Sequence, residues 1–366
     1  MSASSGTIAA GGRDGADWRP TAARETLALR AALLARARGF FAARGVLEVD
    51  TPIVVNAPVT DVHIHSARVT LEPADPAACP GQPFFLHTSP EYAMKRLLAA
   101  GTGDIYQICH VVRALERGRL HNAEFTLIEW YRVGRTLDAL MSEVEALVRD
   151  LLGEPTQGRP LERPQQHPGR APAPQKIATP PPPLRPAKRV SYREAFLDAL
   201  ALDPFTAPLE ALIEHARRAG FDPAASSGRD ELLELLMGTV IGPQLGRQGL
   251  TFVHGYPASQ AALARLDPQD PRAAQRFELY CDGIELANGF HELTAAHEQR
   301  VRFERDIEER RRLGLAPATA DERLLAALES GMPDCCGVAL GFDRTLMLAA
   351  GAPRIDAVLP FPIERA

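Results

Sequence analysis

Cysteine is scarce in this sequence, and its distribution excludes two common uses of the residue. The chain of 366 residues contains five cysteines, at positions 79, 109, 281, 335 and 336, and none of them forms a CxxC motif. An odd number with one adjacent pair argues against both a disulfide framework and a structural zinc site. We therefore expect reduced thiols and a cytoplasmic protein.

Long apolar runs and an excess of positive charge are also missing. No stretch reaches the length needed to span a membrane, and the N-terminus lacks the apolar core of a signal peptide. The formal net charge of −5 argues against a broad nucleic-acid-binding surface, although local basic patches stay compatible with it. Apolar content of 45% and charged content of 24% are typical of a globular protein.

Composition marks two segments that cannot build a core. Residues 1–20 are mostly small, polar and glycine-rich, which predicts a disordered tail. Between about 153 and 189 proline dominates, with PPPP at 180–183, and large apolar side chains nearly vanish. This predicts a solvated surface insertion, with a ligand for a proline-recognition module as the alternative.

The stretch 108–132, ICHVVRALERGRLHNAEFTLIEWYR, predicts an antiparallel hairpin. Two β-like runs flank a polar loop that contains Gly118. Arg113 ends the first run, and the second run carries Glu124 and Glu129 among large apolar residues. Buried carboxylates need partners, so the pattern favours a functional site over a solvated hairpin loop, which is the alternative.

Upstream of this hairpin, two segments combine a helix with a strand. Residues 21–44 repeat apolar side chains at helical spacing, and the predicted helix is followed by a strand interrupted at Pro52. Residues 84–90, FFLHTSP, predict a strand that runs into a helix with Glu91 in its first turn. Between them lies DVHIH at 61–65, whose two histidines lack a third ligand and do not favour a metal site.

Downstream of the insertion, the pattern alternates between helices and a strand. Residues 190–202, 209–219 and 230–237 have helical spacing and are expected to pack outside the sheet, and residues 251–260 predict a strand. The dense mixed charges of 306–313 are typical of a solvated helix face.

A second hairpin is predicted over 276–292, RFELYCDGIELANGFHE. Its Asp282-Gly283 pair is a strong signal for a two-residue type I′ turn. The pairing then places Glu278 and Glu285 on one face as diagonal neighbours, roughly 7–8 Å apart. The predicted cross-strand pairs are Cys281 with Ile284, Tyr280 with Glu285 and Leu279 with Leu286.

Side-chain parity makes two further predictions for this hairpin. Two carboxylates on one face repel each other unless a cation lies between them, so Glu278 and Glu285 suggest Mg²⁺ beside a polyphosphate, with two exposed acids as the alternative. Glu292 would fall on the opposite face of an uninterrupted strand. A bulge or break at Asn288-Gly289 could return it to the face of Glu285.

Near the C-terminus, residues 331–351 predict a strand of small residues that runs into an apolar helix. The junction is Gly341-Phe342-Asp343-Arg344, which places Arg344 in the first turn of the helix. A guanidinium and a helix N-terminus together favour an anion.

In their order along the chain, these segments resemble the motifs of class II aminoacyl-tRNA synthetases, closest to the lysyl branch. The helix–strand–proline unit resembles motif 1, the stretch 108–132 resembles motif 2, and the segment around Arg344 resembles motif 3. TSPE at 88–91 and ELANGFHE at 285–292 resemble lysyl-type pocket segments. The resemblance implies an α+β catalytic core over 21–366, with an antiparallel β-sheet flanked by helices. It also implies ATP, Mg²⁺ and a homodimer built through motif 1.

The same resemblance implies roles for individual residues. Arg113 and Arg344 would be catalytic, on the α- and γ-phosphates of ATP, and Glu278 and Glu285 would hold Mg²⁺. Further residues expected at ATP are Glu116, His121, Asn122, Phe125, Leu286 and Gly341. Those expected at the amino acid are Ser89, Glu91, Glu129, Tyr131, Asn288, Phe290, Glu292 and Ala339.

Three positions depart from the lysyl pattern. Leu115 stands where a glutamate is usual, with Glu116 one place later. Ala123 replaces a proline, and Ala339 replaces a glycine of the pocket floor, where its added methyl favours a changed amino acid. Several acids around an apolar channel suit a short amino acid with two cationic groups, such as lysine or an isomer of lysine.

Only some 20 tail-like residues precede the motif 1 helix, where lysyl-tRNA synthetases carry an anticodon-binding barrel. This architecture resembles the stand-alone synthetase paralogues that activate (R)-β-lysine and transfer it to a lysine side chain of translation elongation factor P. We therefore expect a protein acceptor and no tRNA binding. Two alternatives stay open: a truncated lysyl-tRNA synthetase-like enzyme that charges tRNA, and a non-catalytic synthetase-like regulator.

Overall fold

The structure is a computed structural model that describes residues 18–71, 83–153, 186–224 and 227–366. Most of the predicted tail and of the proline-rich insertion therefore lies outside the described residues. In the described part of the chain, no helix is long and apolar enough to cross a membrane.

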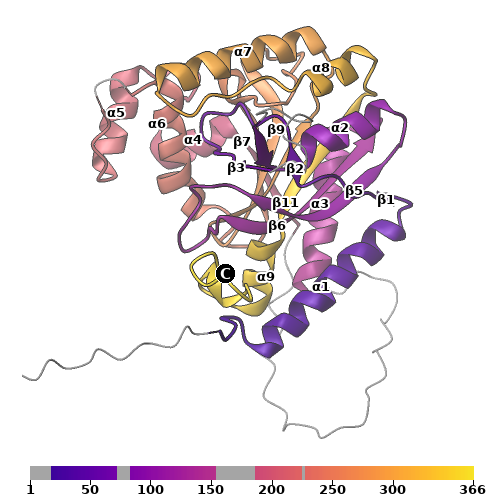
Figure 1. The fold of residues 1–366 in the computed structure, drawn as a ribbon. Helices are drawn as coiled ribbons and strands as arrows, with labels where there is room; N and C mark the ends of the chain where they lie inside the picture. Colours follow the sequence, from indigo (N-terminus) through magenta and orange to yellow (C-terminus); the bar gives the residue numbers. More distant parts are fainter. Residues whose placement is uncertain (1–17, 72–82, 154–185, 225–226) are drawn as a thin grey trace, which may run out of the picture.

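One eight-stranded sheet organises the molecule (Figure 1). Its inner strands are antiparallel, and the pairs at its two edges, β1 with β5 and β7 with β8, are parallel. The largely antiparallel sheet with flanking helices confirms the predicted α+β class. The strands in spatial order are β1 (Leu47–Glu48), β5 (Ile105–Val112), β6 (Glu124–Val133), β11 (Cys335–Gly341), β10 (Ile284–His291), β9 (Ala273–Cys281), β8 (Thr251–Pro257) and β7 (Lys188–Ser191). A separate small sheet has the order β2 (Val54–Val55), β4 (Phe84–Leu86), β3 (Arg68–Val69).

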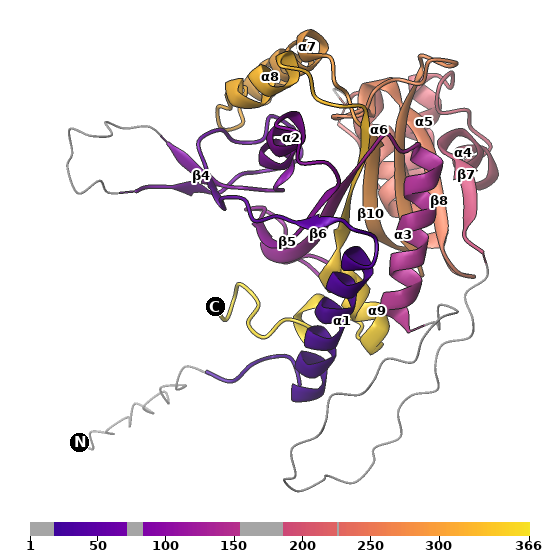
Figure 2. The ribbon, with the colours of Figure 1, turned by 90° about the vertical axis from the view of Figure 1, so that its right-hand side faces the viewer.

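Three helices cover one face of the large sheet and form the main core (Figure 2). They are α1 (Arg24–Ala42), α3 (Leu137–Leu152) and α9 (Phe342–Ala350). Side chains alternate along the strands, so Trp130, Phe277 and Leu340 all point into this layer and are fully buried. Phe41 of α1 stacks on Tyr106 of β5 with ring centroids 4.3 Å apart.

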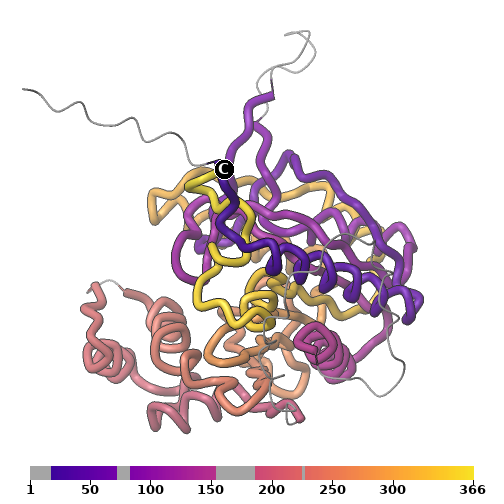
Figure 3. Tube along the Cα trace, turned by 90° about the horizontal axis from the view of Figure 1, so that it is seen from below, coloured from indigo at the N-terminus to yellow at the C-terminus, as the bar shows by residue number. Residues whose placement is uncertain are grey.

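The opposite face is covered only at its two ends, which leaves its centre available for a site. At the β5–β6 end lie α2 (Glu91–Ala99), α7 (Ala296–Arg312) and α8 (Glu322–Glu329). At the β8 end lie α4 (Tyr192–Leu200), α5 (Leu209–Arg218) and α6 (Arg229–Leu236), which gather away from α1 in Figure 3. Short helical turns complete the fold: η1 (Met237–Ile241), η2 (Gly242–Gln244), η3 (Ala258–Gln260) and η4 (Ile355–Ala357).

Both predicted hairpins form, but the register of the second differs from the prediction. Asp282 and Gly283 have φ angles of 49° and 73°, as a type I′ turn requires. The ladder then shifts between Glu285 and Ala287, so that Leu279 pairs with Ala287 and not with Leu286. The bulge thus lies at Leu286, before the predicted Asn288-Gly289 position.

The end of the insertion and the next helix also need correction. Lys188 and Arg189, assigned to the insertion, belong to β7, which pairs in parallel with β8. The helix predicted over 190–202 begins at Tyr192, because Ser191 and Glu194 form a reciprocal capping box that fixes its first turn.

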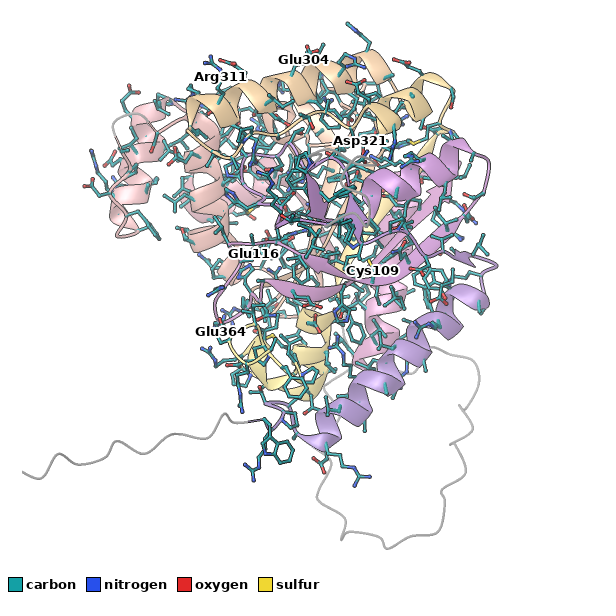
Figure 4. The ribbon with its side chains drawn as sticks, in the orientation of Figure 1. Cys109, Glu116, Glu304, Arg311, Asp321 and Glu364 are labelled. Carbon is teal, nitrogen blue, oxygen red and sulfur yellow. The ribbon has the colours of Figure 1, made fainter. Side chains whose placement is uncertain are left out.

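The mixed-charge run on α7 is largely solvated, as predicted. Glu304 and Arg311 point away from the body of the molecule in Figure 4. Arg310 is the exception, because it is buried and donates hydrogen bonds to the carbonyl oxygens of Asp61, Ile64 and Ala316. It thereby fixes the loop at 61–64 against α7.

A buried ion pair connects α1 with the start of α9. Arg30 of α1 forms an ion pair with Asp343 and also donates to the Thr126 hydroxyl at 2.6 Å. The second oxygen of Asp343 accepts a hydrogen bond from the backbone N–H of Thr126 on β6 at 2.6 Å. One carboxylate therefore holds together the segments predicted as motifs 1, 2 and 3.

We expect the substitution Asp343→Ala to lower the free energy of unfolding by about 3–5 kcal/mol, because it leaves Arg30 and the Thr126 N–H without their acceptor. Urea unfolding monitored by circular dichroism measures the loss. Glu308→Gln, which breaks an exposed pair with Arg311, is the control and should leave the midpoint unchanged. Equal midpoints for Asp343→Ala and wild type would contradict this role.

Candidate active site

A cavity opens at the uncovered centre of the sheet, and almost every site residue predicted from the sequence lines it. Arg113, Glu116, His121 and Phe125 lie in one part of the lining, with Arg344. The other predicted residues in the lining are Ser89, Glu91, Asn122, Glu129, Tyr131, Glu285, Leu286, Asn288, Phe290, Glu292, Ala339 and Gly341. Glu278 is the exception; it lies buried behind the lining.

Cross-strand pairing explains how these residues meet. Glu278 of β9 pairs with Asn288, Asn288 with Ala339, and Ala339 with Glu129 of β6. Directly paired residues share a face of the sheet, so one row of four strands presents these side chains together. The next row on the same face consists of Arg276, Phe290, Gly337 and Tyr131.

In this second row of side chains, position 337 has room only for glycine. A Cβ atom at Gly337 would lie 2.3 Å from the Tyr131 ring and 2.4 Å from Glu292 Oε1. Its backbone N–H also donates a hydrogen bond to the Glu292 carboxylate. Gly337 thus lets the acid and the phenol approach each other over the strand.

Three carboxylates gather at this end of the cavity, contributed by Glu91, Glu129 and Glu292. Glu129 is buried and accepts hydrogen bonds from Ser89 Oγ at 2.7 Å and from the Tyr131 hydroxyl at 2.8 Å. Burial, reinforced by the charge of Glu91, raises the pKa of Glu129 to about 8. Its partners are neutral donors, so its charge is left for a ligand to compensate.

Lys95 is the first of two residues of the site that the sequence analysis missed. Its ammonium lies 2.7 Å from Glu91 Oε1 and 2.6 Å from Glu292 Oε2, and its side chain is almost fully buried. Burial alone would lower the pKa of Lys95, but Glu292 and Glu91 outweigh burial and raise it, so the side chain is charged. Burial raises the pKa of Glu292 to about 7 even with this lysine present. The Glu–Lys spacing of four on a helix was the available signal.

Arginines dominate the opposite end of the cavity. Arg113 donates to Glu116 Oε1 at 3.1 Å, and its guanidinium lies 5.2 Å from the centre of the Phe125 ring. Arg344 donates to the carbonyl oxygen of Glu285 at 3.0 Å and lies 2.6 Å from His121 Nε2. Burial, followed by the charge of Arg344, lowers the pKa of His121, so its imidazole is neutral. Two guanidinium groups thus line this end of the cavity.

The two acids predicted to bind metal are on the same face, as parity requires, but their partners differ. Glu278 Oε1 accepts from Arg276 at 2.6 Å and Oε2 from the Tyr280 hydroxyl at 2.6 Å. Glu285 lies only within 3.5 Å of Arg344, so its oxygens remain available to a hard cation. Within the described ranges, no three His, Cys, Asp or Glu side chains form a metal-ligating group. A cation here would need ligand oxygens from a bound phosphate.

Arg276 is the second residue missed from the sequence. It is fixed by Glu278, by the carbonyl of Gln260 at 2.7 Å and by the ring of Tyr256. Its Nε donates to Asn288 Oδ1 at 3.2 Å and thereby holds the amide group of Asn288, a residue that lines the cavity. Its position two residues before Glu278 on a strand was the available signal.

Other polar residues that the sequence analysis singled out pair with groups of the protein itself. Asn122 lines the cavity, but its Nδ2 donates to the Glu124 carbonyl and its Oδ1 accepts from the backbone N–H of Ile363. Glu124 is exposed and pairs with His110, so only Glu129 of the two hairpin acids is buried. His63 of the DVHIH segment pairs with Glu234.

Comparisons of the sequence with known proteins found one family and several similar relatives. Residues 14–365 match the family described as tRNA synthetases class II (D, K and N). The chain is 45% identical over 349 residues to the elongation factor P–(R)-β-lysine ligase of Vibrio vulnificus (strain YJ016), which covers 95% of this chain and 98% of the relative. Proteins of the same name from Pasteurella multocida (strain Pm70) and Klebsiella pneumoniae subsp. pneumoniae are 41% and 43% identical, each over 96% of this chain and 98% and 99% of their own lengths.

The raised pKa of Glu129 makes stability depend on pH. Below its ordinary pKa of 4.5 the carboxyl is protonated in both the folded and unfolded states. Between there and about 8 only the unfolded state ionises, so rising pH favours unfolding. We expect Glu129→Gln to gain stability over wild type by at least about 1 kcal/mol more at about pH 8.5 than at about pH 5.

Urea unfolding at the two pH values measures this difference. Glu304→Gln, on the solvated face of α7, controls for general effects of pH. A Glu129→Gln advantage that is equal at both pH values would show that Glu129 is ionised in the folded protein throughout the range.

Proposed function

The chain belongs to the class II tRNA synthetases (D, K and N), and from that premise we propose that it is a ligase for translation elongation factor P. It activates (R)-β-lysine with ATP and transfers it to a lysine side chain of the factor. The observation that carries the proposal is the buried acid end of the cavity. Three carboxylates with one internal lysine suit a substrate with two ammonium groups.

Activation joins the substrate carboxylate to the α-phosphorus of ATP. A carboxylate oxygen attacks phosphorus, the bond to the β-phosphate oxygen breaks, and pyrophosphate leaves. Arg113 binds the α-phosphate and stabilises the charge that develops there, and Arg344 binds the γ-phosphate. Glu285, together with phosphate oxygens, would hold Mg²⁺, which would neutralise further phosphate charge, and Glu278 would join as a ligand only by giving up Arg276 or the Tyr280 hydroxyl.

Amino-acid recognition uses the two rows of the sheet. Glu292, Glu129 and Tyr131 receive the distal ammonium, and Phe290 packs on the aliphatic stem. Asn288, oriented by Arg276, faces the carboxyl end. Ala339 lies between Asn288 and Glu129 in its row, so its methyl group shapes the floor beside the reacting end. This placement favours a β-amino acid over lysine.

Transfer completes the reaction. The uncharged Nζ of the acceptor lysine attacks the carbonyl carbon of the adenylate, AMP leaves with the bonding electron pair, and an amide forms. The attacking nitrogen then gives its proton to the phosphate of the departing AMP. No side chain of the enzyme has to act as a nucleophile, so positioning and electrostatics supply the catalysis.

Assembly and cellular location belong to the same proposal. Leu47 lies more than half exposed on β1, at the edge of the large sheet beside α1, and a second copy of the chain would cover it. A homodimer through this edge and a cytoplasmic location fit an enzyme that acts on a translation factor. Transfer to tRNA is not part of the proposal.

The first test is amino-acid-dependent exchange of pyrophosphate into ATP. We expect (R)-β-lysine to support exchange with kcat/KM at least ~10-fold above that for lysine, because shape differences of one substituent in a pocket have about this effect. Purified elongation factor P should then acquire the label of radioactive β-lysine, and bulk tRNA should not. Preference for lysine with tRNA labelling would establish the charging enzyme. No exchange with either amino acid would favour a regulator, which the exposed Leu115 would then help to explain.

Removal of one phosphate-binding arginine tests the catalytic assignment. We expect Arg344→Ala to lower the exchange rate by roughly 10²–10³-fold, the usual loss for one preorganised charge-stabilising group. Arg311→Ala, which removes a guanidinium from the solvated face of α7, serves as the matched control. A near-normal exchange rate in the folded Arg344→Ala protein would refute the role.

A further inference from the structure

We propose that Lys95 is a specificity-determining positioning residue, an internal counter-ion that adjusts the amino-acid pocket to substrates with two ammonium groups. The inference rests on the proposed function, because it concerns how that substrate is selected. Lys95 does not line the cavity. It acts through the acids that do.

The geometry places Lys95 behind two of the three acids. Its side chain is 1% exposed, and its ammonium contacts Glu91 at 2.7 Å and Glu292 at 2.6 Å. Glu292 is also held by the Gly337 backbone N–H. Both carboxylates are therefore fixed in place before a substrate enters, with their charge compensated by only one cation.

The third acid, Glu129, decides the net charge of the pocket. Glu129 is bound by a serine and a tyrosine hydroxyl, which carry no charge. Three carboxylates and one ammonium leave two negative charges when all are ionised. A substrate with two ammonium groups compensates both, whereas a substrate with one leaves a buried carboxylate uncompensated. An uncompensated buried charge is costly and has to be removed by protonation.

Other ionisable groups around Lys95 do not change this balance. Tyr131 of β6 and Cys335 of β11 face the acids, and burial raises the pKa of both, so they are neutral. Cys336 lies in the core layer on the other face of the sheet. His87 at the end of β4 is also neutral, because burial lowers its pKa. Arg96, the next residue of α2, is exposed at the rim.

The match between the charge of the pocket and the charge of the substrate can be tested by a measurement that a purely structural role of Lys95 would not affect. Burial raises the pKa of Glu129 to about 8 and that of Glu292 to about 7. At pH near 7 the free pocket therefore retains between one and two protons, and binding of a doubly cationic amino acid should release them. Without Lys95, the three acids exceed the two ammonium groups of the substrate by one charge, so one of Glu91 and Glu292 holds a further proton that stays bound when the substrate enters.

The experiment is titration calorimetry of (R)-β-lysine in two buffers with different ionisation enthalpies, with wild type and Lys95→Met. We expect wild type and variant to release similar numbers of protons, between one and two, with KM for exchange raised ~10–100-fold in the variant and kcat much less changed, because one of its acids stays protonated and cannot pair with the substrate. Arg218→Met removes the cation of a surface pair with the same spacing of four, and should match wild type. In wild type, 6-aminohexanoate and 3-aminohexanoate, which each retain one amine of the substrate, should bind at least ~10-fold more weakly.

A second variant guards against misfolding of the first. Lys95→Met with Glu292→Gln removes one positive and one negative charge together, so the two remaining acids again match the two ammonium groups of the substrate and KM should fall below that of Lys95→Met. An unchanged KM in Lys95→Met, or a double variant with a KM no lower than that of the single variant, would reduce Lys95 to a structural role. Tighter binding of lysine than of β-lysine would contradict the proposed substrate, and the same test would then be made with lysine. Binding of neither amino acid by wild type would overturn both proposals.

Discussion

The register between β9 and β10 is the constraint on which the site depends. A β-strand alternates its faces with a period of two, so a shift of one residue would send every following side chain to the other face. The bulge at Leu286 inserts one such shift. It brings Asn288 and Phe290 to the face that already holds Glu285, and the chain continues to Glu292 on that side. Without the bulge, the phosphate end and the amino-acid end would lie on opposite faces of the sheet.

Burial of acids follows from this arrangement and has to be compensated. Glu278 is neutralised by Arg276, and Glu91 and Glu292 share Lys95. Glu129 alone receives only neutral donors. Desolvation of an unpaired carboxylate costs several kcal/mol, so the free protein is less stable than a fully paired one would be. That cost is recovered when a cationic ligand binds, which links the affinity of the pocket to the charge of its substrate.

Local signals in the sequence were sufficient for the elements but not for their contacts. The turn at Asp282-Gly283 was predictable because it depends on backbone preferences of two neighbours. The position of the bulge was not, because the pair Asn288-Gly289 also signals a break, whereas the glycine is needed there for another reason: a Cβ atom at Gly289 would lie 2.5 Å from the Phe277 ring of the neighbouring strand. A regular strand with a larger residue there would not fit. Lys95 and Arg276 each have one partner nearby in the sequence, Glu91 and Glu278, but their roles also depend on Glu292 and Asn288, which lie on another segment of the chain.

The two ends of the cavity differ in how firmly their charged groups are held. At the acid end, Lys95 and Glu129 are buried. Glu292 holds the Lys95 ammonium, and Ser89 holds the Glu129 carboxylate. At the phosphate end, Arg113 and Arg344 are partly exposed, and their contacts to carbonyl oxygens and a neutral imidazole are ones that a phosphate would readily replace. A preformed amino-acid pocket and an adaptable nucleotide pocket follow from this difference. Selectivity therefore belongs to the rigid end, where misplaced charge is costly, and the nucleotide end can rearrange as pyrophosphate forms and departs.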